Sequence, residues 1–398
     1  MHSEPVGSVP LRRSLHAKRG GSYRRVLWVL GCGVLPAAVF LSVLLLAVGH
    51  RYAFDLHQFW QGANDVVHGR SPYPARSSLP SAAQAPSLTP LEVQQQLRFP
   101  YPAPAAVALA PFGALPFWAV ATIFTFVLCG ALALALRVLG VRDWRCYGLM
   151  FGSIAAIGAV RLGTFTPLLI LALAVAWRYR DRSWISASVL AAAVVAKLFL
   201  WPVLVWLIAT RRLRTAASSV ALALGSVVVG WSVIGFAGLR DYPHLLSIYS
   251  RAGEAKGFSD VALGLALGLP GSTARALGLV LGAAALAAVF VAARRRDGDR
   301  RAFIVSIAAS LLLTPIVWLH YFALLYVPVA VSRRRFGAAW LLPLVLWVSP
   351  FEESHGDAWR LVVVLACTAG VVGMSLLSGP RVARAQRTTP AIGREVPA

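Results

Sequence analysis

Long apolar segments, separated by short basic clusters, limit what this chain can fold into. An α-helix needs roughly 20 apolar residues to cross the hydrocarbon core of a bilayer. A transmembrane β-barrel would instead alternate apolar and polar residues in segments of about ten, which these runs do not do. The sequence therefore predicts an all-α polytopic membrane protein. Five segments meet the length requirement with almost no charge: 26–48, 118–136, 216–236, 272–293 and 361–377.

Shorter apolar segments extend this pattern to a bundle of about twelve transmembrane helices. Several are too short to cross about 30 Å at about 1.5 Å per residue. Broken helices are tolerated where they line a cavity, so we expect two pairs of short spans to meet at an external cleft. The expected spans are 26–48, 116–137, 146–160, 164–177, 184–197, 198–210, 215–237, 272–293, 302–315, 318–332, 337–349 and 359–378.

The distribution of charge predicts the topology. A net charge of +23 would suggest nucleic-acid binding in a soluble protein, but 27 of the 38 Lys and Arg residues fall in seven clusters that alternate with the spans. The positive-inside rule then places both termini in the cytoplasm. We expect basic tails at 1–25 and 379–398, a transmembrane domain at 26–378, and a first external loop at 49–103. Nucleic acid is not an expected partner, whereas membrane lipids are.

Other compositional signals are weaker. Arginine far outnumbers lysine, and alanine, glycine and valine are abundant, which is typical of a GC-rich bacterial genome and fits a bacterial plasma membrane. The four cysteines show no metal-ligand or redox spacing, so no metal site or disulfide is implied.

The segment RYAFDLHQFWQGANDVVHGRSPYP, residues 51–74, is an unusually polar insertion between apolar stretches. Asp55 follows the first span closely and has aromatic neighbours, so its carboxylate should be partly desolvated and its pKa raised, as a general base requires. The alternative is that Asp55 is only the N-cap of a surface helix over 55–68. Further on, the tract 76–96 is expected to be mobile and 99–118 to hold a short interfacial element, while FEESHGD at 351–357 is expected to be an exposed acidic loop.

The pattern D-L-x-x-F-x-x-G-A-x-x-x-x-x-G-x-x-P-Y at 55–73 resembles the first external loop of glycosyltransferase family 87. These are polyprenol-phosphate-mannose-dependent mannosyltransferases of the GT-C superfamily. Further matches follow in order along the chain, and together they cover most of it. They are F-x-Y-P-x-P at 99–104, Pro111, the link at Gly163, Lys197 at the end of a short span, and T-P-x-x-W-x-H-Y at 314–321. The chain departs from the family pattern at Thr164, Leu198, Leu319 and Tyr321.

This resemblance implies an inverting transfer of a sugar from a polyprenyl-phosphate donor to a glycolipid or cell-envelope glycan on the external (periplasmic) side. Mannose is the expected sugar, with arabinose or another pentose left open. Asp55 would be the general base. Lys197, His320 and Arg161 would bind the donor phosphate, because a cation inside an apolar span is costly without an anion. Tyr73, Tyr101, Trp318 and His57 would contact sugar or acceptor.

Each of these assignments has an alternative. Lys197 could extend its ammonium to the interface, Arg161 could be an interfacial anchor, and His320 could be a packed core histidine. The aromatic residues could belong to the belt at the membrane interface. No cofactor or metal is expected, since a single phosphate already attached to lipid needs no chelated diphosphate. The alternative function is a secondary transporter or lipid-linked-sugar flippase, against which the missing internal repeat argues.

Overall fold

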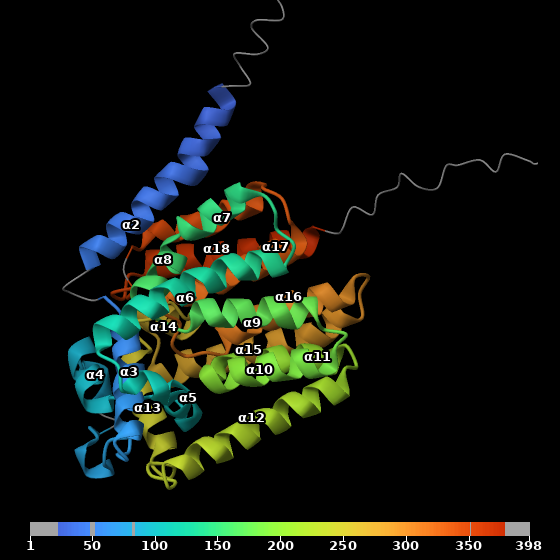
Figure 1. The fold of residues 1–398 in the computed structure, drawn as a ribbon. Helices are drawn as coiled ribbons and strands as arrows, with labels where there is room; N and C mark the ends of the chain where they lie inside the picture. The colour runs from blue at the N-terminus through green and yellow to red at the C-terminus, as the bar shows by residue number, and fades with distance from the viewer. Residues whose placement is uncertain (1–22, 48–51, 82–83, 351, 379–398) are drawn as a thin grey trace, which may run out of the picture.

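The computed structural model describes residues 23–47, 52–81, 84–350 and 352–378, so most of the two basic tails lies outside the described residues. Within these ranges every regular element is helical and none is a strand. The prediction of an all-α protein is therefore confirmed. Figure 1 shows most of the helices packed side by side, with α2 (Leu35–Ala47) projecting away from the others.

Five helices are long and apolar enough to cross a membrane, and they correspond to the five segments that the sequence singles out. The first, Tyr23–Leu46, combines a π-helical turn η1 (Leu30–Val34) with α2, and only 11% of its most apolar window is buried. The chain therefore has the helices of a polytopic membrane protein. The other four are α6 (Phe117–Val138), α12 (Leu213–Val233), α15 (Gly271–Ala293) and α18 (Ala358–Leu377).

The remaining expected spans are also helical, but they are short. α8 (Ile154–Arg161) and α9 (Thr166–Arg178) form a pair bent by 115°, which brings the number of spans that pass on length and composition to six. Twelve full crossings therefore stay a prediction. The other short helices are α7 (Trp144–Phe151), α10 (Ser183–Ala196), η4 (Leu198–Leu200), α11 (Pro202–Ala209), α16 (Gly298–Leu312), η5 (Leu319–Leu325), α17 (Tyr326–Ser332), η6 (Ala338–Trp340) and η7 (Leu342–Val348).

The first loop is folded rather than extended. It contains α3 (Phe54–Val67), two 3-10 turns, η2 (Arg76–Ser78) and η3 (Ala85–Ser87), and α4 (Pro90–Leu97), and α5 (Ala103–Gly113) follows. The tract 76–96, whose expected mobility stays a prediction, contains regular elements in its described part. Thr89 and Glu92 form a reciprocal capping box, which satisfies two backbone N–H groups at the start of α4.

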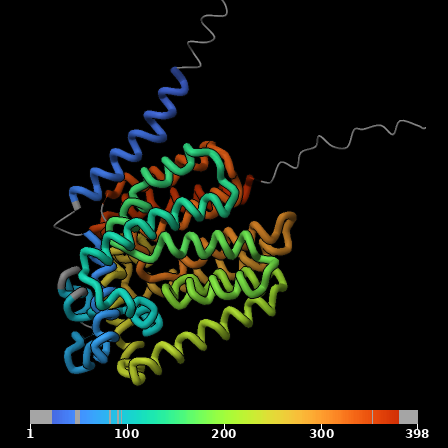
Figure 2. Tube along the Cα trace, in the orientation of Figure 1, coloured from blue at the N-terminus to red at the C-terminus, as the bar shows by residue number. Residues whose placement is uncertain are grey.

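A second inserted segment joins the first loop at the same end of the bundle. The stretch after α12 folds into α13 (Tyr242–Gly253) and α14 (Asp260–Ala266), and α13 packs against η3 and α4. Figures 1 and 2 show α3, α4, α5 and α13 gathered at one end of the helices. An aromatic core lies beneath them, in which Phe59 stacks between Tyr101 and Phe165 at ring-centroid distances of 4.0 Å.

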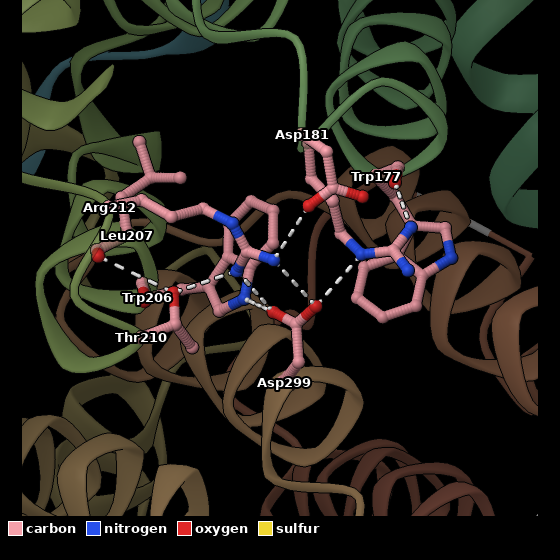
Figure 3. A network of polar contacts seen from close by, with 8 residues as sticks. Trp177, Asp181, Trp206, Leu207, Thr210, Arg212 and Asp299 are labelled. Atoms are coloured by element: carbon pink, nitrogen blue, oxygen red, sulfur yellow. Dashed lines mark hydrogen bonds and ion pairs between the residues drawn. The ribbon is translucent and has the colours of Figure 1, made fainter. Parts of the chain in front are cut away.

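Three of the basic loops meet around Asp299, at the start of α16 (Figure 3). The Asp299 carboxylate accepts hydrogen bonds from Arg180 and Arg212, at 2.8 and 2.7 Å, and from the Trp206 indole at 2.8 Å. Arg180 follows α9, Arg212 precedes α12, and Asp299 lies just after the α15–α16 turn. The chain turns that carry these three basic clusters therefore lie together, as an alternating topology requires.

Candidate active site

Asp55 is held at the start of α3 by the break between α8 and α9. The first backbone N–H groups of a helix have no partner within it. Here the N–H groups of Asp55 and Leu56 both donate to the carbonyl of Leu162, at 3.0 and 3.2 Å. Ala53, in the left-handed conformation with φ 54°, is the N-cap, and no side chain caps the helix. The alternative that Asp55 is only an N-cap is therefore wrong.

Gly163 makes this close approach possible. Its φ of +69° lies in the left-handed region, and a Cβ at this position would lie 2.6 Å from the Cβ of Leu56. Glycine is thus required both by the conformation of the break and by the packing of α3 against it. This contact fixes where Asp55 lies relative to the helices that follow.

Four ionisable side chains from distant parts of the chain surround Asp55. Asp55 is partly buried, and removal from water raises the pKa of its carboxyl group. The charges of His320, Lys197 and Arg161 oppose this rise in the pKa, and that of Glu352 adds to it. The structure thus brings together the four residues predicted for catalysis and phosphate binding. Their roles stay predictions.

Lys197 lies buried at the end of α10, with 8% of its surface exposed. Its Nζ donates a hydrogen bond of 3.0 Å to the hydroxyl of Tyr321 and lies 4.8 Å from the centre of the Tyr101 ring. No carboxylate of the described residues forms a salt bridge with it. A buried ammonium among phenol rings does not fit the alternative that Lys197 extends to the interface, and it has the capacity to bind an anion.

His320 is oriented by a carboxylate that the sequence analysis did not select. Its Nδ1 lies 3.0 Å from Glu352 Oε2, and Arg161 Nη2 lies 3.9 Å from Glu352 Oε1. Gly158 leaves room for this carboxylate, since a Cβ there would lie 2.3 Å from Oε1. The other ring nitrogen of His320, Nε2, is buried and has no hydrogen-bond partner among the described residues. A carboxylate on one imidazole nitrogen orients the ring and presents the other nitrogen to a ligand.

Glu352 corrects the expectation that FEESHGD is an exposed acidic loop. Its side chain is only 17% exposed and contacts two candidate phosphate ligands. The signal available in the sequence was two adjacent acids just before an apolar span, on the same predicted side of the membrane as Arg161 and His320. Nothing in the sequence identified which acid pairs with which base.

The predicted aromatic contacts divide into two groups. Tyr101 lies in the site, because its ring contacts the Lys197 ammonium and stacks on the ring of Phe59. Trp318 is partly buried and hydrogen bonds the hydroxyl of Tyr249, a residue of α13 that the charge of Asp55 also reaches and that sequence reasoning missed. Tyr101 and Trp318 therefore border the site.

Tyr73 and His57 lie away from the charged cluster. The hydroxyl of Tyr73 donates to the backbone carbonyl of Tyr101 at 2.8 Å, and its ring is parallel to that of Trp231. His57 contacts the Phe117 ring at 4.9 Å and lines a separate cavity, and burial lowers its pKa. Tyr73 thus supports the backbone of the site. The structure does not bring His57 to Asp55.

The described residues contain no group of three His, Cys, Asp or Glu side chains that could hold a metal ion. Metal independence stays a prediction, because it concerns the reaction and not the arrangement of these side chains.

Comparison with known proteins identifies similar chains. The model of glycosyltransferase family 87 matches residues 99–319. A polyprenol-phosphate-mannose-dependent alpha-(1-2)-phosphatidylinositol pentamannoside mannosyltransferase of Mycobacterium tuberculosis (strain CDC 1551 / Oshkosh) is 29% identical over 350 residues, covering 80% of this chain and 74% of the relative. A protein of the same name from Mycolicibacterium smegmatis is 25% identical over 320 residues, covering 75% and 71%. No solved structure matches significantly.

The family match includes Arg161 and Lys197, but it begins after Asp55 and ends one residue before His320. The family match does not cover Asp55, His320 and Glu352. Their position beside Arg161 and Lys197 is seen only in the structure and is therefore independent of that match. The sequence match and the spatial grouping thus point to the same site.

Proposed function

Because the chain belongs to glycosyltransferase family 87, we propose that it transfers mannose from polyprenyl-phosphate-mannose to a glycolipid acceptor on the external face of the membrane. The family makes it a glycosyltransferase. Both mycobacterial relatives are named for this donor and for a phosphatidylinositol pentamannoside acceptor. We extend the donor to this chain and keep the acceptor at the level of a glycolipid or envelope glycan.

In the proposed reaction an acceptor hydroxyl oxygen attacks the anomeric carbon of mannose. The bond from that carbon to the phosphate oxygen breaks on the opposite side, so the configuration inverts. Asp55 accepts the hydroxyl proton, and the polyprenyl phosphate leaves with the electron pair. A general base must be ionised and must reach the reacting hydroxyl. The cations around Asp55 favour its ionised form against the effect of burial.

The leaving phosphate needs positive or hydrogen-bonding groups where its negative charge increases. Lys197, Arg161 and the unpartnered Nε2 of His320 supply such groups from three different elements. The single observation that carries the proposal is that these three lie around one partly buried carboxylate. Metal-free chemistry is part of the proposal, because one phosphate ester can be stabilised by these side chains alone.

The distribution of charge supports the proposed external location of the site. The basic clusters that meet at Asp299 mark the cytoplasmic side by the positive-inside rule. We place the folded loop that carries Asp55 on the opposite side, and both termini in the cytoplasm of a bacterial cell.

The test is transfer by the purified protein in lipid nanodiscs. Wild type should move radiolabelled mannose from polyprenyl-phosphate-mannose to an extracted glycolipid fraction. Asp55→Asn keeps the size of the side chain but removes the base, so transfer should fall by about 10²–10⁴-fold, the usual contribution of general base catalysis. Asp241→Asn is the matched control, because Asp241 pairs with exposed Arg76 on the surface of the same end.

The control variant should retain transfer close to that of wild type. If Asp55→Asn also retains it, while folding as wild type does, Asp55 is not the base. If wild type shows no transfer but carries the labelled lipid across the nanodisc, the alternative of a transporter or flippase replaces the enzyme.

A further inference from the structure

A cavity of about 590 Å³ lies along α3, next to the site but separate from its charged cluster. Its walls come from α3, the turn that follows it, and the end of α4. Three glutamines line it, Gln58 and Gln61 from α3 and Gln95 from α4, and Asp55 does not. These three side chains can donate and accept hydrogen bonds without carrying charge.

The geometry of α3 connects this cavity to Asp55. Residues three or four apart lie on the same face of a helix. Asp55, Gln58, Gly62 and Asp65 follow one another at such spacings, and the last three line the cavity. At about 1.5 Å per residue this stripe is about 15 Å long. One face of α3 therefore carries Asp55 at its start and residues of the cavity wall beyond it.

Gln58 carries the strongest indication of a ligand. It is only 4% exposed, and its side chain has no hydrogen bond to any described residue. Its carboxamide atoms are not themselves closed off from solvent, so they face the open space of the cavity. A ligand that supplies hydroxyl groups in the cavity would give the Gln58 amide its partners.

Two of the three charged groups at the cavity balance each other. Asp65 Oδ1 accepts a hydrogen bond of 2.9 Å from Arg70 Nε, which leaves little net charge on that wall. The Trp60 indole donates to the carbonyl of Leu115 at 2.9 Å, and this bond fixes its ring at the cavity wall. Carboxamides beside a fixed aromatic ring suit a neutral ligand that has hydroxyl groups and apolar ring faces.

Arg98, on the cavity rim, adds a strained backbone. Its φ of 35° is a conformation that residues other than glycine rarely adopt. Such strain concentrates at sites of ligand binding. No ion pair of Arg98 occurs among the described residues, so its guanidinium is available to a ligand.

We propose that this cavity binds the oligosaccharide of the acceptor, that is, the hexose units behind the one that receives the new sugar. The proposal rests on the proposed function, because that function supplies a glycolipid whose terminal hydroxyl lies at Asp55. The cavity then selects acceptors by glycan length: a single sugar reaches Asp55 alone, whereas a longer chain also occupies the cavity.

The test measures binding without the donor, by calorimetry on the full protein in nanodiscs, with mannose and mannotetraose as probes. Wild type should bind mannotetraose more tightly than mannose. Gln58→Leu and Gln95→Leu each remove hydrogen bonds to the sugar, so the Kd for mannotetraose should rise by roughly tenfold. Gln96→Leu is the matched control, the same change at the neighbouring residue of α4 that does not line the cavity.

Stability and transfer kinetics complete the test. Gln58→Leu should keep or raise the melting temperature, since the Gln58 amide makes no hydrogen bond to the described residues that the change could break, whereas loss of a merely structural glutamine would lower it. In the transfer assay the two cavity variants should raise KM for the glycolipid acceptor and leave KM for the donor unchanged.

Unchanged mannotetraose binding in both cavity variants, or a wild type that binds mannose as well as mannotetraose, would overturn the proposal. These outcomes are separable from failure of the proposed function. A wild type that binds mannotetraose but transfers no mannose contradicts the transferase, whereas one that transfers normally with unaltered acceptor KM in the variants contradicts only the cavity.

Discussion

At the scale of single residues, the sequence identified groups by the cost of keeping them in an apolar chain. Lys197 and Asp55 stand out on that ground, and the structure brings them together. Glu352 did not stand out, because the free-energy cost of burying an acid in a polar loop is unknown until the structure shows that the acid is buried. Its contact with His320 joins residues 32 positions apart and depends on how η5 packs against the last loop. Tertiary pairing of this kind cannot be read from composition or spacing.

Glu352→Gln tests whether this carboxylate positions His320. The amide keeps the size of the side chain but loses the negative charge, so the imidazole is less firmly oriented and kcat should fall by roughly 10- to 100-fold, as for other carboxylates that orient a histidine. The pH profile should change as well. The charge of Glu352 raises the pKa of Asp55, so its removal lowers that pKa and moves the acidic limb of kcat to lower pH.

Glu353→Gln is the matched control, since it makes the same change at the adjacent residue, for which no contact with His320 is seen. A merely structural role for Glu352 would lower the yield of folded protein and leave the acidic limb where it is in wild type. An unchanged acidic limb in a well-folded Glu352→Gln protein contradicts the positioning role.

At the scale of elements, the length of the apolar segments predicted the helices closely, whereas the amount of helix in the polar loops was underestimated. The helical ranges follow the expected spans because burial in lipid or protein selects apolar runs irrespective of partners. The tract around α4 was expected to be mobile from its Ser, Pro and Ala content, although Thr89-Pro90-Leu91-Glu92 is readable as a capping box. The 115° bend after α8 was expected only as a break, and its backbone contact with the start of α3 was not predicted.

Gly163→Ala should show that this break positions Asp55. Alanine would adopt an unfavourable left-handed φ and would place its Cβ 2.6 Å from that of Leu56, so α3 must shift. We expect a loss of stability of about 1–3 kcal/mol from the strain, and a fall in kcat that is larger than stability alone explains. Thermal unfolding and transfer kinetics in nanodiscs measure the two effects.

Gly268→Ala separates strain from displacement of α3. Gly268 also has a left-handed φ, +83°, but a Cβ there meets nothing within 4 Å. This variant should lose a similar amount of stability while its kcat stays near that of wild type. Equal kcat in both glycine variants would contradict the role of the break.

At the scale of the whole molecule, the fold keeps two groups of charged residues apart, the cluster around Asp55 and the ion pairs around Asp299. In Figure 1 the helices of the folded first loop and α13 lie at one end, and the turn between α15 and α16 lies at the other. Asp55 belongs to the start of α3 in the first group, and Asp299, with its ion pairs, follows that turn. Positive charge clusters predicted this separation along the chain before any contact was known. Which end faces the cytoplasm is decided by insertion into the membrane, so labelling in cells is the direct measurement.

Ser78→Cys and Ser183→Cys test the orientation. Both serines are exposed, Ser78 in η2 of the first loop and Ser183 at the start of α10, next to the basic loop that contains Asp181. The four native cysteines are buried or half-buried, which keeps background labelling low. In intact cells an impermeant maleimide should label Ser78→Cys alone, and Ser183→Cys should react only after the membrane is opened, because the positive-inside rule keeps the arginine-rich loops inside. Labelling of Ser183→Cys alone in intact cells would place Asp55 in the cytoplasm and contradict an external active site.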